Sequence, residues 1–296
     1  MFKKLHTHWG YLSLVAAFMT FIALTMRFVP VEFLEVYPLL FSSPLIVAMI
    51  WLEKKDPARK DWLLNQGDFL ADLIHSFVLF PVIVLLSSWL NRWFFTGFSI
   101  PTFQFELLNQ SLALKFLVTL LFAELFFYLI HRFAHENRFL WRFHRIHHGA
   151  DRVYWANAAR FHPFDLFLTM TLYFFPVYLM GANEQILCLF VAINIVTGLL
   201  EHANIQYASR TANRIFNTSE LHRWHHSTVA GEYQKNYGKV LCVWDVFFRT
   251  WYYRETDFVK EVGTRDDYSP VSNRLMAQMK QPFIEKTGQR GIYDVS

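Results

Sequence analysis

Residues 131–148 read HRFAHENRFLWRFHRIHH and hold five of the 13 histidines in the chain. Within this stretch the histidines form one HxxxH and one HxxHH motif, and a second HxxHH follows later in the chain. The eight motif histidines are His131, His135, His144, His147, His148, His222, His225 and His226. Side chains three or four residues apart share one face of a helix, so each motif presents its imidazoles as a cluster.

Repeated spacing of this kind predicts a metal site. A neutral imidazole offers a lone pair from one ring nitrogen while the other nitrogen donates to a neighbouring group. A single histidine such as His6 is well explained as an ordinary polar residue, whereas three clusters in one chain are not. His131 and His144 would point in different directions on an unbroken helix, so we expect a bend near Asn137.

The rest of the chain is strongly apolar, with 54% hydrophobic residues and 32 phenylalanines. Long apolar runs at 11–29, 33–52, 69–90 and 112–130 predict membrane helices, and shorter runs at 164–180 and 185–200 predict a short hairpin. We therefore expect an all-α integral membrane protein with about four transmembrane helices, a short hairpin and a cytoplasmic, helical, histidine-rich metal-binding cap. The expected parts are an N-terminal transmembrane region (1–110), a catalytic domain (111–254) and a polar tail (255–296).

Basic residues indicate the orientation of the chain. Lys3 and Lys4 precede the first apolar run and Lys54 and Lys55 follow the second, which predicts that both ends of this pair are cytoplasmic. An even number of crossings, or none, then separates the histidine clusters, so one cytoplasmic site can hold them all. Basic residues beside apolar spans suit a membrane surface, and we expect no nucleic-acid partner. With only two cysteines, far apart in the sequence, the chain predicts neither a disulfide framework nor a thiolate metal site.

With His202, which lies between the two HxxHH motifs, the candidate ligands number nine. Nine imidazoles are too many for one ion, because zinc takes four ligands and other first-row metals about six. Two ions with four or five ligands each would use them and leave open positions. Such a pair can react with dioxygen or activate water, and imidazole ligands alone do not select iron over zinc.

The segments HRFAHE, FHRIHH, RFHPFD, EHANI and ELHRWHH, followed by NYG and WDVFF, resemble the fatty acid hydroxylase superfamily, also called the sterol desaturase family. The resemblance covers roughly residues 115–250, and its ordered histidine motifs are highly specific. It implies a membrane enzyme with a non-haem di-iron centre that oxidises lipid C–H bonds with dioxygen and external electrons. The cofactors would be two Fe²⁺ ions, which zinc can replace in purified protein.

The resemblance also implies roles for single residues. The eight motif histidines would ligate the metals, and His202 in EHANI would be a further ligand. His162 in RFHPFD would ligate a metal or anchor its loop. Glu136 matches a glutamate of some relatives that would act in catalysis by orienting His135 or carrying protons; the alternative is a surface carboxylate paired with a neighbouring arginine. Gln206 stands where some relatives carry another histidine.

Other partners follow from what the sequence lacks. It contains no Gly-rich dinucleotide fingerprint and no recognisable haem-binding module, so the electrons must come from a separate donor. A reductase with a ferredoxin or a cytochrome b5-like carrier is expected. Glu201, Glu220 and Asp245 are candidate acceptors for ligand N–H groups, on the ground of their adjacency in the sequence alone.

Three alternatives to a lipid hydroxylase stay open. A lipid or sterol desaturase of the same family would share the first hydrogen abstraction. A membrane zinc hydrolase would be expected to carry HExxH, whereas HRFAH lacks that glutamate. A metal transporter would place its ligands along the membrane spans. The lipid itself is not identified: a sterol, a fatty acyl chain, a sphingoid base, an ether lipid or an aminolipid headgroup would each suit.

Overall fold

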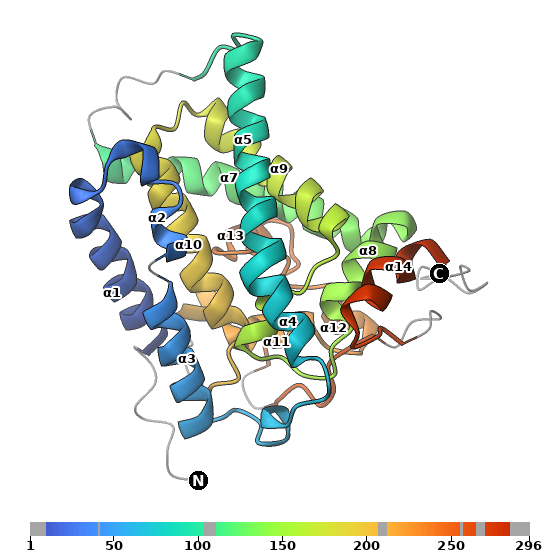
Figure 1. The fold of residues 1–296 in the computed structure, drawn as a ribbon. Coiled ribbons are helices and arrows are strands. Elements are labelled where there is room, and N and C mark those ends of the chain that lie inside the picture. Colours follow the sequence, from blue (N-terminus) through green and yellow to red (C-terminus); the bar gives the residue numbers. More distant parts are fainter. Residues whose placement is uncertain are drawn as a thin grey trace.

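A computed structural model of the chain describes residues 10–40, 42–103, 111–206, 212–254, 257–264 and 270–284. These residues form helices joined by loops, with only isolated β-bridges between the loops. Figure 1 shows long helices packed beside one another, with several shorter helices gathered toward the lower right of the view. The expected all-α architecture is confirmed for the described part of the chain.

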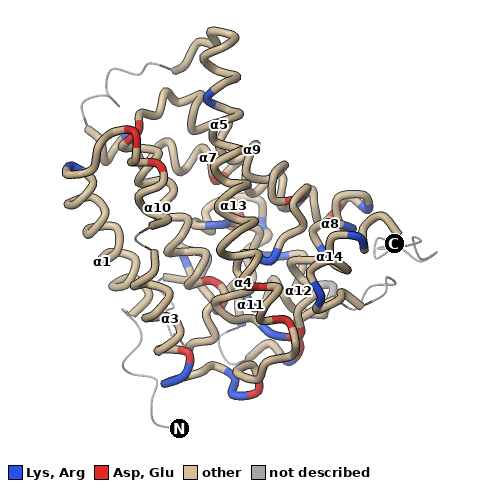
Figure 2. Tube along the Cα trace, in the orientation of Figure 1, with Lys and Arg blue, Asp and Glu red and all other residues tan. Residues whose placement is uncertain are grey.

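Four helical stretches are long and apolar enough to cross a membrane, namely Gly10–Phe28, Phe69–Gly97, Leu112–Glu136 and Glu184–His202. The first consists of α1 (Gly10–Thr25) and a 3₁₀ turn, η1 (Met26–Phe28). The second joins α4 (Phe69–Ile74), a π-helical turn, η4 (His75–Leu79), and α5 (Phe80–Gly97). The third and fourth are α7 (Leu112–Glu136) and α10 (Glu184–His202). In Figure 2 a largely uncharged stretch of α1, α5 and α10 separates charged residues at its two ends, as a bilayer requires.

Two details differ from the expected spans. The run 33–52 is not one long helix, because η2 (Val31–Phe33) and the single turn α2 (Tyr37–Leu40) precede α3 (Ser43–Lys55). Pro44 lies in the first turn of α3, where its missing N–H costs nothing, so it marks a helix start. The run 185–200 is not short, because capping by Asn183 and the polar end at His202 extend α10 to 19 residues. Only its partner α9 (Pro163–Leu179) is of the shorter kind.

The helices pack around α9 and α10. Helix α9 lies between α5 and α7, while α1 and α2 pack on α10. The buried core that joins them is rich in aromatic side chains, with Tyr173, Phe174 and Phe190 each exposed by 2% or less. Because α7 and α10 both end on the same side as the start of α9, the segments that follow them meet there.

Short elements close this end of the bundle. They are α8 (Arg138–His148), η3 (Asp61–Leu63), η5 (Trp155–Ala159), η6 (Ala212–Arg214), α11 (Ser219–His225), α12 (Ala230–Tyr233), α13 (Val243–Phe247) and α14 (Leu275–Ile284). The polar tail contributes α14, which packs against α8, and Gln278 Oε1 lies 2.8 Å from His75 Nε2. The division of the chain at residues 110 and 254 stays a prediction.

Candidate metal centre

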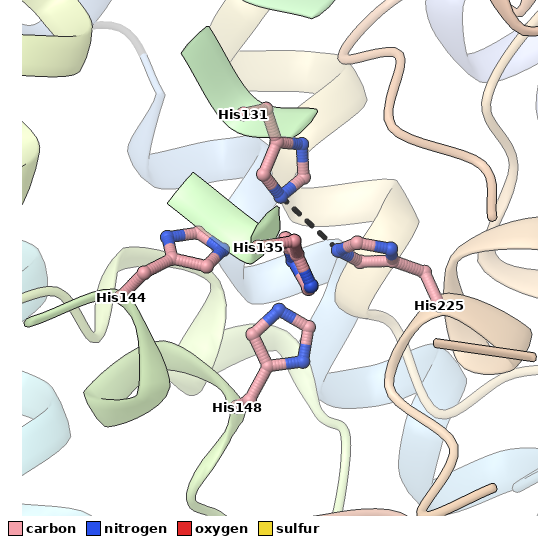
Figure 3. A group of neighbouring side chains, drawn as sticks. All are labelled: His131, His135, His144, His148 and His225. Atoms are coloured by element: carbon pink, nitrogen blue, oxygen red, sulfur yellow. Dashed lines mark hydrogen bonds between the residues drawn. The ribbon is translucent and has the colours of Figure 1, made fainter. Parts of the chain in front are cut away.

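Nine buried histidines converge in two neighbouring groups at the end of the helix bundle. The first group contains His131, His135, His144, His148 and His225, and the second contains His147, His202, His222 and His226. Within each group the candidate ligand atoms all lie within 4.8 Å of one another. Figure 3 shows the five rings of the first group directed toward a common centre. These are the nine histidines that the motifs and EHANI predicted, divided five and four.

The HxxHH spacing explains how two groups arise from shared helices. Neighbouring residues are turned by about 100° around a helix, so adjacent histidines face different centres, whereas residues four apart face the same one. On α8, His144 and His148 therefore point to the first group and His147 to the second. The second HxxHH, on α11, mirrors this division, because His222 and His226 join the second group and His225 the first.

A break at Asn137 brings α7 and α8 together, as predicted. Asn137 has extended backbone angles (φ −101°, ψ 118°) that end α7. Its side-chain Oδ1 accepts hydrogen bonds from the amides of Phe139 (3.0 Å) and Leu140 (3.1 Å) and so caps the start of α8. The two helices consequently face one another, and the ring of His144 packs 4.9 Å from those of His131 and His135.

Fixed acceptors orient most of the rings through Nδ1. The pairs are His131 with Tyr237 O (2.7 Å), His144 with Asp165 Oδ2 (3.0 Å), His147 with Arg160 O (3.2 Å), His202 with Asn157 Oδ1 (2.8 Å) and His225 with Lys235 O (2.8 Å). A carbonyl oxygen can only accept, so the ring nitrogen facing it carries the proton. Nε2 is then left as a lone pair directed toward the centre of its group, the arrangement found for metal-bound histidine.

The inward-facing nitrogens are arranged as they would be around a bound cation. His131 Nε2 lies 3.1 Å from His225 Nε2 (Figure 3). Neither Nε2 carries a proton, because each ring donates its N–H to a backbone carbonyl through Nδ1. Two lone pairs at this distance repel one another unless a positive charge lies between them. In the second group, His222 Nε2 lies 2.9 Å from His202 Nε2 and 3.0 Å from His226 Nε2, and an Nε2–H of His222 could be donated to only one of these two neighbours. The donor set therefore fits two metal ions.

Burial lowers the pKa of several of these histidines and so favours their neutral form. Burial, followed by the influence of neighbouring histidines, lowers the pKa of His147, His148, His222 and His225 well below its usual value. Burial and the neighbouring His144 lower the pKa of His226 to about 3. A metal ion therefore meets little competition from protons at neutral pH.

A buried charge network holds the loop that supports the second group. Asp72 on α4 binds Arg160 Nε through Oδ1 at 2.6 Å, and Asp68 bridges Arg160 (2.9 Å) and Arg152 (2.6 Å). All four side chains are 3% exposed or less. Through this network α4 positions the carbonyl of Arg160 that accepts from His147. The sequence spacing places three polar residues, Asp68, Asp72 and His75, on one face of a helix. In the structure the two aspartates bind Arg152 and Arg160, and His75 contacts Gln278, so all three hold the fold together.

Two candidate residues lie outside both groups. His162 caps α9: its Nδ1 accepts from the Phe164 amide (3.1 Å) and its Nε2 lies 3.2 Å from Met279 O. Both ring nitrogens thus serve the backbone, which matches the loop-anchoring alternative. Glu136 is 47% exposed and pairs with Arg132 at 2.7 Å, one helical turn away. It does not reach the imidazoles.

Three expected acceptors of ligand N–H groups bind other partners. Glu201 lies 3.3 Å from Lys239 Nζ, Glu220 accepts from Asn213 and Tyr253, and Asp245 accepts from the amides of Tyr237 and Gly238. The acceptors that orient the rings are instead Asp165, Asn157 and backbone carbonyls. They lie between 10 and 106 residues from the histidines that they orient, so adjacency in the sequence could not identify them. Gln206, where some relatives carry a histidine, is exposed.

The sequence also offered an overlooked signal in Glu124, a charged residue in the middle of the apolar helix α7. Its Oε2 accepts from the amides of Val240 and Leu241, both at 2.9 Å, and Tyr173 donates to its Oε1. Glu124 thereby holds the 237–241 segment, which contains the acceptor of His131, against the bundle. A carboxylate at membrane depth is costly and marks such a site.

A cavity of about 350 Å³ reaches both groups of histidines. Its walls include His131, His144, His147, His202 and His222 at one end and apolar side chains of α2, α5, α9 and α10 toward the other. Five aromatic residues lie near the histidine motifs in the sequence, namely Trp141, Phe143, Tyr154, Trp155 and Trp224, and of these Trp155 lines the cavity. All five are buried, so they form no exposed belt at the membrane surface. The metal-binding centre is thus accessible through an apolar passage.

Comparison with known proteins agrees with these features. The family model described as fatty acid hydroxylase matches residues 116–250. Ornithine lipid hydroxylase OlsE of Rhizobium tropici is 30% identical over 83% of this chain and 74% of its own length. Alkylglycerol monooxygenase of Danio rerio is 24% identical over 71% of this chain, and methylsterol monooxygenase 1 of Rattus norvegicus 23% identical over 47%. The chain spans less than half of these last two relatives (46% and 48%), and no solved structure matches it.

Proposed function

The chain belongs to the fatty acid hydroxylase family, and on that premise we propose that it is a membrane-bound oxygenase that hydroxylates a lipid with dioxygen at a di-iron centre. The observation that carries the proposal is the convergence of nine buried imidazoles at one end of an apolar cavity. The overall reaction takes one lipid C–H bond, dioxygen, two electrons and two protons, and yields the lipid alcohol and water.

The proposed ligands are the five histidines of the first group and the four of the second. Two bound Fe²⁺ ions would supply the reaction with dioxygen and the oxidising power that breaks the C–H bond. The protein contributes the fixed orientation of the rings through Nδ1 and a passage lined largely by apolar groups, which excludes water from the centre. Zinc can occupy the same all-imidazole set in purified protein without supporting oxidation.

Glu136 supports the proposed centre from a distance, through a chain of hydrogen bonds. Glu136 pairs with Arg132, Arg132 donates to Tyr128 OH (3.4 Å), and Tyr128 OH lies 3.0 Å from Thr250 Oγ1. Thr250 in turn donates to Asp245 Oδ1 (2.7 Å), which accepts from the Tyr237 amide (2.8 Å). The Tyr237 carbonyl accepts from His131. We therefore propose a positioning role for Glu136 that acts through His131, in place of the orientation of His135 or the proton transfer that the resemblance implied.

The electrons come from a separate donor, for which we propose a reductase with a ferredoxin or a cytochrome b5-like carrier. The basic residues flanking the apolar spans support a cytoplasmic position for the centre, where such donors are found. Of the lipids considered, an aminolipid is the first to test, because the ornithine lipid hydroxylase covers most of this chain. Hydroxylation and desaturation share the hydrogen abstraction and are distinguished by the product.

The decisive experiment is incorporation of oxygen-18 from ¹⁸O₂ into lipid by purified protein in nanodiscs with Fe²⁺ and a reducing system. We expect one labelled oxygen per product molecule, with no product from His147→Ala protein or from zinc-loaded protein. An unsaturated product without label would identify a desaturase. Product formed without dioxygen would identify a hydrolase, and either result would overturn the proposed hydroxylation.

A further inference from the structure

A buried pair of opposite charges lies in the wall of the cavity. Lys239 Nζ is 3.3 Å from Glu201 Oε2, and the two side chains are 16% and 3% exposed. Both residues line the cavity together with five of the candidate metal ligands, and Glu201 directly precedes one of them, His202. Taking charges out of water is costly, and a pair that only faced an apolar space would gain little from it.

The pair has unused capacity for hydrogen bonds. Among the described residues, Glu201 Oε1 has no hydrogen-bond partner although it is buried. An ammonium group has three donors, and the contact with Glu201 uses one of those of Lys239. A ligand carrying both an acidic and a basic group could thus bind without first breaking the pair.

The surrounding backbone is built to hold Lys239 at this position. The Lys239 amide lies 3.3 Å from Glu124 Oε2, the carboxylate that also binds the two following amides. Its ammonium lies over Gly198 of α10, where a Cβ atom would come within 2.9 Å of Nζ. A glycine at this point makes room for the charge beside α10.

The cavity also indicates how a lipid would lie. Along α10 the lining residues run from His202 at the end of the helix back to Asn194, a distance of about 12 Å at 1.5 Å per residue. Leu40 and Phe77 also line the cavity and are 67% and 54% exposed, so its lining includes apolar side chains that reach the surface of the molecule. A lipid whose chains remain in the bilayer would then place its headgroup at the metal end.

We propose that Lys239 and Glu201 bind the carboxylate and the ammonium group of a zwitterionic lipid headgroup, and so direct oxidation to the headgroup end of the lipid. This inference rests on the proposed lipid oxygenase. The lipid carboxylate, the Lys239 ammonium, the Glu201 carboxylate and the lipid ammonium would then alternate in sign, so Lys239 and Glu201 each gain a second partner of opposite charge. In a cavity of low polarity such charge pairs are stronger than in water. A neutral or singly charged headgroup would leave one member of the pair without this compensation.

The test compares three lipids that differ only in the headgroup: an acylated ornithine with free carboxylate and ammonium groups, its methyl ester and its N-acetyl derivative. Binding to metal-loaded protein is measured by native mass spectrometry without turnover, and hydroxylation is measured separately with its position in the product. The variants are Lys239→Met, Lys239→Arg and Glu201→Gln. Lys280→Met, which removes an exposed lysine of α14, is the matched control.

We expect wild-type protein and the control to bind the zwitterion at least about tenfold more tightly than either derivative. Lys239→Met should abolish the preference over the methyl ester, Lys239→Arg should restore it, and Glu201→Gln should abolish the preference over the N-acetyl lipid. Equal binding of all three lipids to wild-type protein would overturn the inference about the headgroup, while the proposed lipid oxygenase activity would be unaffected. Selective binding without oxygen-dependent oxidation would instead support the headgroup site and contradict the proposed function.

Glu201 has one competing role, which the same variants separate. If it served only to transfer protons, Glu201→Gln would slow hydroxylation of every lipid equally while leaving their binding unchanged, and the inference would be overturned. If Lys239→Met lost its metal, the Lys239→Arg protein would decide, because a retained charge should retain the carboxylate preference.

Discussion

The Nδ1 atom of His144 lies 3.0 Å from Oδ2 of Asp165, and both side chains are about 5% exposed or less. Asp165 stands in the first turn of α9, so one buried carboxylate links the α8 histidines to the helix that packs between α5 and α7. The bond fixes the orientation of the ring and increases the basicity of Nε2, which faces the first group.

Replacing Asp165 with asparagine should therefore weaken the centre without removing a ligand. We expect a loss of metal affinity or activity of about 10- to 100-fold, the range for partners of metal-bound histidines. Metal content measured after dialysis against a graded chelator, together with hydroxylation rate, checks this. Asp151→Asn, a change at an exposed position, is the control, and equal metal retention in the two variants would contradict the role of Asp165.

His147 and His162 are a matched pair for testing ligand assignment. His147→Ala should abolish lipid oxidation while the protein stays in the membrane fraction, because it removes a proposed ligand of the second group. His162→Ala should keep its metal, since both ring nitrogens bind the backbone. Loss of the cap of α9 should cost about 1 kcal/mol of stability. Metal analysis and thermal unfolding of both variants give the result, and metal loss in His162→Ala would show that this histidine contributes to the centre.

Glu136→Gln tests the hydrogen-bond chain to His131. We expect a partial loss of activity, smaller than that of His147→Ala, with metal content unchanged, because the variant alters an exposed ion pair rather than a ligand. Such a surface pair contributes about 1 kcal/mol or less to stability. Tyr128→Phe interrupts the same chain at a buried position and should reproduce the effect. Full activity in both variants would show that the chain does not support the centre.

Acid should release the metal and destabilise the protein. Burial lowers the pKa of His226 to about 3 in the folded chain, compared with about 6.5 when unfolded. Above pH 6.5 this histidine is neutral in both the folded and the unfolded state and does not affect the free energy of unfolding. Below pH 6.5 the unfolded chain binds a proton at this histidine and the folded chain does not, which favours unfolding. Stability should therefore fall as pH drops from about 6.5 toward 3. Thermal unfolding and metal content between pH 7.5 and pH 5 measure this, and an unchanged metal content at pH 5 would contradict it.

The buried network on α4 should dominate the stability of the metal-binding end. Asp72→Ala leaves the guanidinium of Arg160 buried with one carboxylate fewer, and breaking a buried pair in this way costs about 3–5 kcal/mol. The Arg160 carbonyl should then shift and loosen His147. Thermal unfolding with and without metal checks both effects. Asp61→Ala breaks an exposed ion pair with Arg59 and is the control, for which we expect little change.

The sequence by itself determined the candidate ligands and the membrane character of this protein. Helical periodicity makes HxxxH and HxxHH face common centres, and the length of the apolar runs requires membrane helices, because both follow from local geometry. Asn137 likewise carried its own signal as a helix cap. The tertiary structure alone decided which histidines share a centre, which carboxylates orient them and where the charged pair Lys239 and Glu201 lies. Those contacts join residues up to about a hundred positions apart, and their closeness depends on how α7, α9 and α10 pack rather than on any local pattern.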